Sequence, residues 1–198
     1  MASLFFTLVI AYLIGSIPTG YLIVKAKTGE DIRKVGSGST GATNVKRVLG
    51  KKWFFIVMFL DALKGALPVI LATLFITAGA SYGLAPVIAA VAVIIGHSKS
   101  CFLGFKGGKS VASGVGTIIA LNWIAGIIIA VVWGIITYST KYVSVGSICA
   151  LLISPFLMYF LGAPIAYIVY CALGAIYIVY LHRENIKRLI NGNENKVR

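Results

Sequence analysis

Residues 96–114 read GHSKSCFLGFKGGKSVASG, and this segment joins two apolar runs of the sequence. It contains three lysines, and Gly107 and Gly108 stand directly before the last of them, Lys109. Consecutive glycines allow backbone N–H groups to converge on one point, and the N-terminus of a following helix adds partial positive charge there. The segment therefore predicts an anion site, most naturally for a phosphate group, at a membrane surface.

Two other interpretations of this segment need to be weighed. A turn with glycine and lysine is also typical of an ordinary cytoplasmic loop between membrane helices, because such loops collect positive charge. A nucleotide-binding P-loop is excluded: the pattern G-x-x-x-x-G-K-[ST] fits at Gly108, Lys109 and Ser110, but Leu103 stands where its first glycine is required. The segment also follows an apolar run of membrane type and not a strand. The choice therefore lies between a plain loop and a phosphate site.

The composition is that of a membrane protein. Of the 198 residues, 59% are hydrophobic and only 12% are charged, so we predict one membrane domain over residues 1–198. The formal net charge of +13 is confined to short segments. Such a balance suits positive-inside topology, anionic lipid head groups or anionic substrates. Nucleic acid is not an expected partner, because little soluble surface remains to present a basic footprint.

The lengths of the apolar runs predict the number of membrane spans. The runs cover residues 3–24, 53–78, 84–97, 111–138, 143–161 and 164–181. A span needs about 20 residues, so the fourth run is too long for one upright helix and short for two. If it turns near Asn122 and crosses twice, all charged connections fall on one side of the membrane, and the uncharged ones near Ala80, Asn122 and Gly162 fall on the other. We therefore predict an all-α, polytopic integral membrane protein with about seven transmembrane helices, the amino terminus outside and the carboxyl terminus cytoplasmic.

A polar segment before the second apolar run reads GSGSTGATNVKR at residues 36–47. Its cations suit a phosphate, since arginine can grip one with two parallel hydrogen bonds and lysine supplies a point charge. A flexible linker would explain the glycines and serines, but not an amide and two cations within the next one or two helical turns. The candidate substrate-binding residues here are Ser37, Thr40, Asn44, Lys46 and Arg47.

Asp61 and Lys64 form a charged pair inside the second apolar run. They are three residues apart and therefore share a helix face. Ionisable groups within a membrane span usually face the protein interior and are candidates for a functional site. The alternative is a buried pair that braces the helices below the basic loops.

Further candidates stand where other apolar runs begin or end. Ser144 and Ser147 could both donate to an anion from one helix face, although membrane serines often bond the carbonyl one turn earlier instead. His97 and His182 are the only histidines, and each stands beside a polar segment. Either histidine could be a general base or simply a packed residue. Asn185 would share a helix face with His182.

The sequence lacks the signatures of several other chemistries. The three cysteines, Cys101, Cys149 and Cys171, have no metal-type spacing, so we expect neither a metal nor another cofactor. The H-x4-D signature of many lipid acyltransferases would need Asp where Phe102 stands. Only five acidic residues occur in the chain. The chemistry must therefore depend mainly on cations, N–H groups and hydroxyls.

Taken in order along the chain, these motifs resemble those of the bacterial acyl-phosphate-dependent glycerol-3-phosphate acyltransferases. The resemblance extends over almost the whole chain and rests on residues 15–20, 41–44, 61–65, 96–97, 102–109, 144–147 and 182–186. The family usually has Asn, Pro and Gly where this chain has Ser39, Ser100 and Ser110. The first difference puts an amide-specific contact at Ser39 in doubt, whereas the other two alter loop stiffness more than chemistry.

The resemblance implies a reaction, a location and partners. A fatty acyl group would pass from acyl phosphate to the 1-hydroxyl of glycerol 3-phosphate, which gives lysophosphatidic acid and inorganic phosphate in the first step of phospholipid synthesis. The protein would lie among the lipids of the bacterial cytoplasmic (inner) membrane, with its active site at the cytoplasmic face. A separate phosphate acyltransferase would supply the donor.

The implied reaction assigns roles to the candidate residues. Lys109 and the N–H groups of Gly107 and Gly108 would hold the phosphoryl group of acyl phosphate. Arg47, supported by Lys46, would hold glycerol 3-phosphate. The expected catalytic residues are Lys109, Ser147, His182 and Asn185, and the expected substrate-binding residues are Ser37, Thr40, Asn44, Lys46, Arg47, His97, Gly107, Gly108 and Ser144. The base that accepts the hydroxyl proton would be His182 or a phosphate oxygen of the donor.

Two other classes of function compete with an enzyme. A transporter or channel for phosphate-bearing solutes would need polar or broken spans that line a path to the far side, whereas the polar residues here gather on one predicted side. A scaffold that docks on acidic lipid would leave Gly107, Gly108 and Asn185 unexplained.

Overall fold

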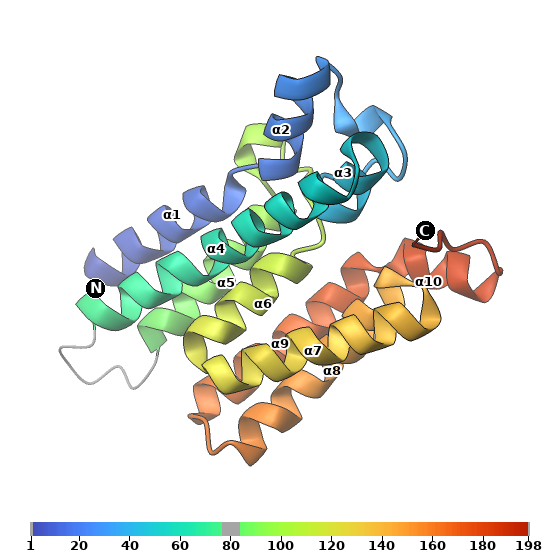
Figure 1. Ribbon diagram of the computed structural model, residues 1–198. Coiled ribbons are helices and arrows are strands. Elements are labelled where there is room, and N and C mark those ends of the chain that lie inside the picture. The colour runs from blue at the N-terminus through green and yellow to red at the C-terminus, as the bar shows by residue number, and fades with distance from the viewer. Residues whose placement is uncertain (1, 77–83, 198) are drawn as a thin grey trace.

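The helices of the computed structural model follow the apolar runs of the sequence (Figure 1). The structure describes residues 2–76 and 84–197. In chain order its elements are α1 (Ala2–Ser16), α2 (Thr19–Thr28), the short 3-10 helix η1 (Ile32–Lys34), α3 (Ala42–Leu49), α4 (Lys51–Phe75), α5 (Leu84–Ser98), the 3-10 helix η2 (Cys101–Leu103), α6 (Val111–Leu121), α7 (Trp123–Thr140), α8 (Val143–Phe160), α9 (Ile165–Leu181) and α10 (Arg183–Ile190). These ranges contain no strand, which confirms the all-α class. The predicted connection near Ala80 lies outside the described residues.

Several segments are long and apolar enough to cross a membrane. Within the described ranges five meet this test: Leu4–Thr28, Lys51–Phe75, Leu84–Leu103, Trp123–Thr140 and Val143–Phe160. The pair α9 and α10, bent by 58°, makes a sixth if it counts as one span, and α6 is apolar but has only 11 residues. The chain is thus a multi-pass membrane protein. The total of seven spans and their orientation remain predictions.

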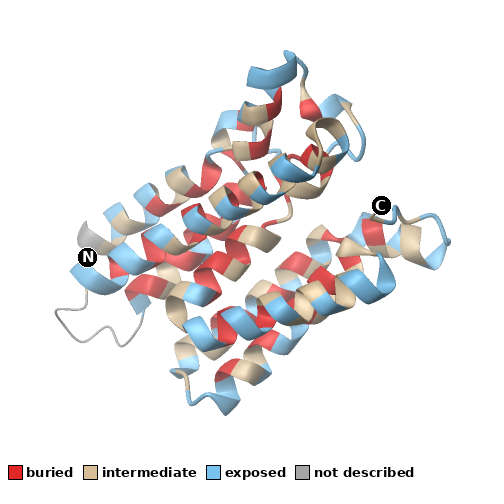
Figure 2. Ribbon diagram, in the orientation of Figure 1, coloured by how far each residue is buried: buried red, intermediate tan, exposed pale blue. Residues whose placement is uncertain are grey.

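The surface of the helices is apolar, as expected for contact with lipid. Large side chains such as Phe5, Phe59, Phe156 and Ile176 are each more than 60% exposed. Figure 2 shows exposed residues on the outer faces of the helices and buried residues between them. In water such a surface would be costly, whereas in hydrocarbon it is the expected one.

The fourth apolar run is divided at Asn122, where the sequence predicts a turn. Asn122 has an extended backbone, and its Oδ1 accepts a hydrogen bond of 3.0 Å from the N–H of Ala125, which caps the start of α7. The chain reverses direction there, and α7 packs against α6 (Figure 1). Gly126 allows the close approach, because a Cβ at this position would lie 2.3 Å from Cγ1 of Ile119.

The helices form two groups. In the first group α1, α4, α5 and α6 pack on one another, with α2 and α3 beside α4. In the second group α8 packs against both α7 and α9. The turn between α6 and α7 joins the two groups, and α9 also contacts α5 and α6. Candidate site residues of both groups line a cavity that lies between the groups.

Within the first group, the packing of α6 on α4 depends on Gly116, because a Cβ there would lie 2.0 Å from the carbonyl oxygen of Ala62. We predict that Gly116→Ala lowers the free energy of unfolding by about 1–3 kcal/mol through overpacking. The control is Gly134→Ala, where a Cβ would meet no atom within 4 Å and alanine favours the helix. Thermal unfolding in detergent measures both variants, and equal losses of stability would contradict the packing role of Gly116.

Candidate active site

A cavity of about 440 Å³ lies between the two groups and collects most of the residues singled out from the sequence. Its wall includes Ser37, Asn44, Arg47, His97, Lys109, Ser144, Ser147, His182 and Asn185. Thr40, Lys46, Gly107 and Gly108 are not part of this wall. Segments that are far apart in sequence therefore converge on one space, to which both groups contribute.

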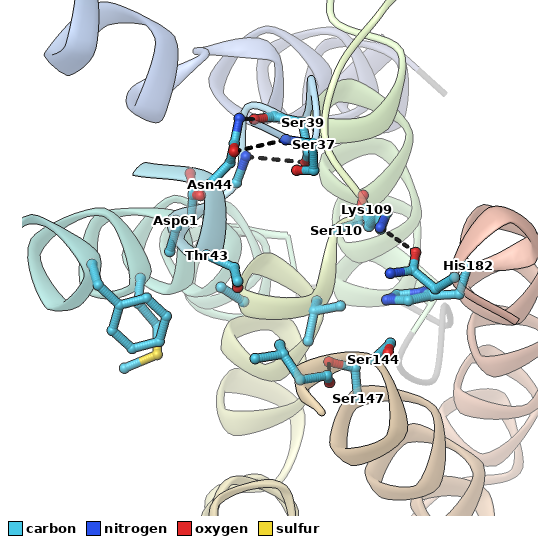
Figure 3. A pocket seen from close by; sticks show the side chains of 18 of the residues that line it. Ser37, Ser39, Thr43, Asn44, Asp61, Lys109, Ser110, Ser144, Ser147 and His182 are labelled. Carbon is cyan, nitrogen blue, oxygen red and sulfur yellow. Dashed lines mark hydrogen bonds between the residues drawn. The ribbon is translucent and has the colours of Figure 1, made fainter. Parts of the chain in front are cut away.

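Lys109 and Asn185 meet across the cavity. Lys109 stands just before α6 in the first group, Asn185 lies on α10, and the lysine Nζ donates a hydrogen bond to Asn185 Oδ1. Figure 3 shows the side chains of Lys109 and His182 converging from opposite groups. Burial lowers the pKa of Lys109 to about 8, and the positive charge of nearby Arg188 acts in the same direction. The ammonium is charged at neutral pH and has little water around it, so an anion is a favourable partner.

A carboxylate that the sequence did not reveal, that of Glu194, lies beside Asn185. Glu194 accepts hydrogen bonds from Asn185 Nδ2 at 2.6 Å, from Arg188 Nε at 2.7 Å and from Ser144 Oγ at 2.9 Å. Burial alone would raise the pKa of Glu194, but these bonds outweigh it and hold the pKa below its usual range. Because Nδ2 of Asn185 is bonded to Glu194, Oδ1 is left to face Lys109.

His182 is oriented by the helix that precedes it. The ring is buried, and its Nδ1 lies 2.8 Å from the carbonyl oxygen of Ile178. A carbonyl oxygen can only accept, so Nδ1 carries a proton, and in the neutral ring Nε2 then has the lone pair. His182 can therefore accept a proton through Nε2.

The expected role of Gly107 and Gly108 is corrected by the structure. Their N–H groups donate to the carbonyl oxygens of Ser98 and His97, each at 3.0 Å, and do not face the cavity. Glycine is required for a steric reason, because a Cβ at Gly107 would lie 2.0 Å from the carbonyl oxygen of His97, and one at Gly108 would lie 2.3 Å from its Nε2. The glycines fold the loop back against α5 and so place Lys109.

Asn44 is also a structural residue and not a free substrate ligand. Its Oδ1 accepts from the N–H of Ser37 at 3.0 Å, and its Nδ2 lies 3.3, 2.9 and 2.9 Å from the carbonyl oxygens of Ile32, Val35 and Ser39. The side chain is 1% exposed. The polar atoms of Asn44 thus hold the loop together. The bond at position 39 is made by the backbone carbonyl, so this contact does not depend on the side chain and is kept with the serine of this chain.

Ser147 is similarly occupied. Its hydroxyl donates to the carbonyl oxygen of Val143 at 2.8 Å and accepts from Nε1 of Trp133 at 3.2 Å. A hydroxyl has one proton, so Ser147 has none left for an anion. The expected catalytic role is therefore replaced by a structural one, in which Ser147 fixes the indole of Trp133 on the cavity wall.

The remaining candidates of the first polar segment differ in position. Ser37 and Arg47 are exposed and line the cavity. Thr40 is buried and lines a separate small cavity together with Asp61 and Lys64. Lys46 lies beside Arg47 in sequence but outside the wall of the main cavity. Of these remaining candidates, Ser37 and Arg47 are therefore the ones that a substrate in the main cavity could reach.

For Asp61 and Lys64 the structure supports a bracing role. Lys64 Nζ lies 2.8 Å from Asp61 Oδ1 and donates to the carbonyl oxygen of Ile17 at 2.6 Å, which ties α4 to the turn between α1 and α2. His97 is held from the other side by Ser113, whose Oγ lies 2.9 Å from its Nδ1. His97 is thus a buried residue that packs against the loop carrying Lys109, and it also forms part of the cavity wall.

The cavity suits an anion with an apolar tail. Among the described residues no group of three or more His, Cys, Asp or Glu side chains could hold a metal ion. The wall contains the cations Arg47, Lys109 and Arg188 together with apolar side chains that include Phe54, Met58, Val115 and Trp133. A few convergent polar groups in an apolar pocket are typical of a ligand site.

Comparison with known proteins identifies the family. A family model described as glycerol-3-phosphate acyltransferase matches residues 5–192. The chain belongs to this family. Among its relatives, the glycerol-3-phosphate acyltransferase of Nostoc sp. (strain PCC 7120) is 43% identical, with 95% of this chain and 89% of the relative covered. The acyltransferase of the same name from Thermotoga petrophila is 44% identical, with 96% and 94% covered.

Solved structures of an acyltransferase from the same family agree with the fold. The crystal structure of PlsY, an integral membrane glycerol 3-phosphate acyltransferase, in its glycerol 3-phosphate form has a TM-score of 0.91 and 38% identity, with 99% of this chain and 96% of that chain covered. The lysophosphatidic acid form of PlsY has a TM-score of 0.88 and 36% identity, with the same coverage. The chain is thus an acyltransferase with an integral membrane fold.

The contacts of Glu194 predict its contribution to stability. Glu194→Ala leaves Asn185 Nδ2 and Ser144 without their acceptor and Arg188 without its partner, so the free energy of unfolding should fall by about 1–3 kcal/mol. Glu184→Ala is the matched control, because the Glu184 side chain is 58% exposed and its ion pairs, with Lys187 at 3.4 Å and with Arg183 at 3.9 Å, lie on the surface. Exposed pairs contribute about 0–1 kcal/mol. Thermal unfolding compares them, and a Glu194 variant as stable as the control would contradict the assigned contacts.

Proposed function

We propose that the protein transfers a fatty acyl group from acyl phosphate to the 1-hydroxyl of glycerol 3-phosphate, giving lysophosphatidic acid and inorganic phosphate. The observation that carries this proposal is a single cavity whose wall combines the cations Arg47, Lys109 and Arg188 with apolar side chains. The two forms of PlsY, named for glycerol 3-phosphate and lysophosphatidic acid, support the acceptor and the product. The choice of acyl phosphate as donor follows from the motif resemblance.

In this proposal the two phosphate groups bind to different cations. The phosphoryl group of the donor binds Lys109 and displaces its contact with Asn185, whose carboxamide then helps to orient the substrates. The phosphate of glycerol 3-phosphate binds Arg47 and Ser37, which are exposed and line the cavity. Arg188 is a third cation in the wall, and its guanidinium keeps donors besides the Nε that bonds Glu194. The acyl tail lies along the apolar wall.

The chemical step is a direct acyl transfer. The 1-hydroxyl oxygen of glycerol 3-phosphate attacks the carbonyl carbon of acyl phosphate, the bond from this carbon to the phosphate oxygen breaks, and inorganic phosphate leaves. The hydroxyl proton passes either to Nε2 of His182 or to a phosphate oxygen of the donor. Phosphate is already a good leaving group, so the protein contributes mainly by charge stabilisation and by positioning two bound substrates.

The proposed location is the bacterial inner membrane, with the mouth of the cavity on the cytoplasmic side. The basic segments and both bound phosphates would then face the compartment that holds glycerol 3-phosphate, in keeping with positive-inside topology. Seven spans, with α6 and α9 among them, would place all charged connections on this side. The donor would come from a separate phosphate acyltransferase, and its acyl chain would enter from the lipid phase.

The test uses purified protein in detergent with radiolabelled glycerol 3-phosphate and either acyl phosphate or acyl coenzyme A. We expect labelled lysophosphatidic acid with acyl phosphate, together with equimolar inorganic phosphate. Product from acyl coenzyme A alone would contradict the proposed donor. In sealed vesicles, uptake of label without any lipid product would instead identify a transporter.

Replacement of His182 by Ala separates the two candidate bases. If Nε2 accepts the proton, kcat should fall by roughly 10²–10⁴-fold, the usual contribution of a general base. If the donor phosphate accepts it, most of the turnover should remain. Initial rates at saturating substrate, with thermal unfolding as a check on folding, distinguish these results.

The lowered pKa of Lys109 predicts an alkaline limit on donor binding. Lys109 loses its proton as the pH rises through about 8, so KM for acyl phosphate should be low below this pH and rise above it, whereas an ordinary lysine stays charged to a pH of about 10. Lys109→Arg keeps the charge and should move the limit upward. Lys106→Arg is the control, because Lys106 is exposed and outside the cavity wall. An identical pH profile in all three proteins would contradict the role of Lys109.

A further inference from the structure

Two tyrosine hydroxyls on α9 form hydrogen bonds from the second group of helices to the first. Tyr177 OH lies 2.8 Å from Oγ of Ser98 on α5. Tyr170 OH lies 2.5 Å from Oγ1 of Thr117 on α6. Thr117 is fully buried, Tyr170 is 7% exposed and Tyr177 is half-buried, so water competes little for these bonds. Neither tyrosine lines the cavity or takes part in the chemistry described above.

The direction of both bonds follows from their neighbours. Ser98 Oγ already donates to the carbonyl oxygen of Ile94 at 3.0 Å, and Thr117 Oγ1 donates to that of Gly114 at 2.7 Å. Each hydroxyl has one proton, so the tyrosine must be the donor in each pair. The four hydroxyls are therefore all engaged, and each contact has a defined length and direction.

The two bonds together fix both the depth and the tilt of α9. Tyr170 and Tyr177 are seven residues apart, so they lie on one helix face about 10 Å apart along the axis. One contact would allow α9 to pivot, whereas two do not. Ile178 and Ile94 flank Gly114, since a Cβ at Gly114 would lie 3.5 Å from the Cδ1 atom of each. Such apolar packing is not directional, because dispersion and hydrophobic contacts tolerate sliding.

The position of α9 determines where the second half of the site lies. Tyr177 is five residues from His182 and eight from Asn185, and the chain bends by 58° between α9 and α10. Lys109, in contrast, belongs to the first group. A pivot of α9 together with the rest of the second group would therefore change the distance between Lys109 and the pair His182 and Asn185.

We propose that Tyr170 and Tyr177 are positioning residues that set the distance between the two groups and so align the substrates for acyl transfer. This inference rests on the proposed function. Each substrate is held chiefly by cations of the first group, Arg47 and Lys109, while His182 and Asn185 come from the second. Loss of the tyrosine hydroxyls thus leaves binding largely intact and misaligns the reacting groups, for which a displacement of about 1 Å can cost roughly 100-fold in rate.

The test compares Tyr170→Phe, Tyr177→Phe and the double variant, which remove only the hydroxyls. We expect kcat to fall about 10-fold in each single variant and up to about 100-fold in the double variant, with KM for glycerol 3-phosphate within about 2-fold of the parent value. Tyr180→Phe is the matched control on the same helix, because Tyr180 is 59% exposed; its kcat should be unchanged.

A double-mutant cycle with the partner residues identifies the mechanism. Ser98→Ala combined with Tyr177→Phe should cost no more in kcat than either change alone, since both remove one bond. Thermal unfolding of every variant provides the stability measurement. Two results would overturn the inference. One is a double tyrosine variant that keeps the kcat of the parent protein, and the other is a fall in kcat that is no larger than the fall in the fraction of folded protein. Absence of turnover in the parent protein would contradict the proposed function, and the inference with it.

Discussion

The ammonium of Lys109 reaches the cavity only because the loop before it folds back on the end of α5. The N–H groups of Gly107 and Gly108 bond the carbonyls of Ser98 and His97, and Ser110 Oγ donates to the carbonyl of Ile94 at 2.9 Å. These bonds satisfy backbone and side-chain groups that would otherwise be buried without partners. They also direct the one side chain between them, that of Lys109, away from α5 and toward the second group of helices.

Behind this loop the protein buries charge at a cost that only pairing can offset. Asp61 and Lys64 are nearly inaccessible, and a buried ion without a partner is strongly destabilising. The pair therefore tells more about why one arrangement of the helices is selected than about how stable the protein is. Its contacts form only when α4, the turn at Ile17 and His97 hold these relative positions. The same register supports the loop that carries Lys109, so the structural and functional parts of the first group form one unit.

The sequence predicts the helices and the convergence of the site better than the use of individual polar groups. The length of the apolar run and the placement of the charges predict the turn at Asn122. Both can be read from the sequence, because the membrane limits the length of a span and favours positive charge on one side. The doublet Gly107-Gly108 indicates close approach of the backbone, but not that His97 is the approaching residue. The tight bonding of Asn44 and Ser147 likewise depends on partners brought together by folding. Glu194 belongs to no pattern, since it stands in a polar segment that resembles a solvated end.

The second group shows how a few hydrogen bonds can determine the geometry of a site within an apolar surrounding. Glu194 orients Asn185, and Ile178 orients His182 through its carbonyl. These partners restrict each functional side chain before any substrate is present, which lowers the cost of ordering it during binding.

Phe59 on α4 lines the cavity and is 64% exposed. The cavity is therefore open at a large apolar side chain, of the kind that suits contact with lipid. Under the proposed function, a newly made lysophosphatidic acid could leave sideways into the surrounding leaflet, with its tail never passing through water. Release would then depend on the order and packing of neighbouring acyl chains, so the physical state of the bilayer would feed back on the rate at which the bilayer is built.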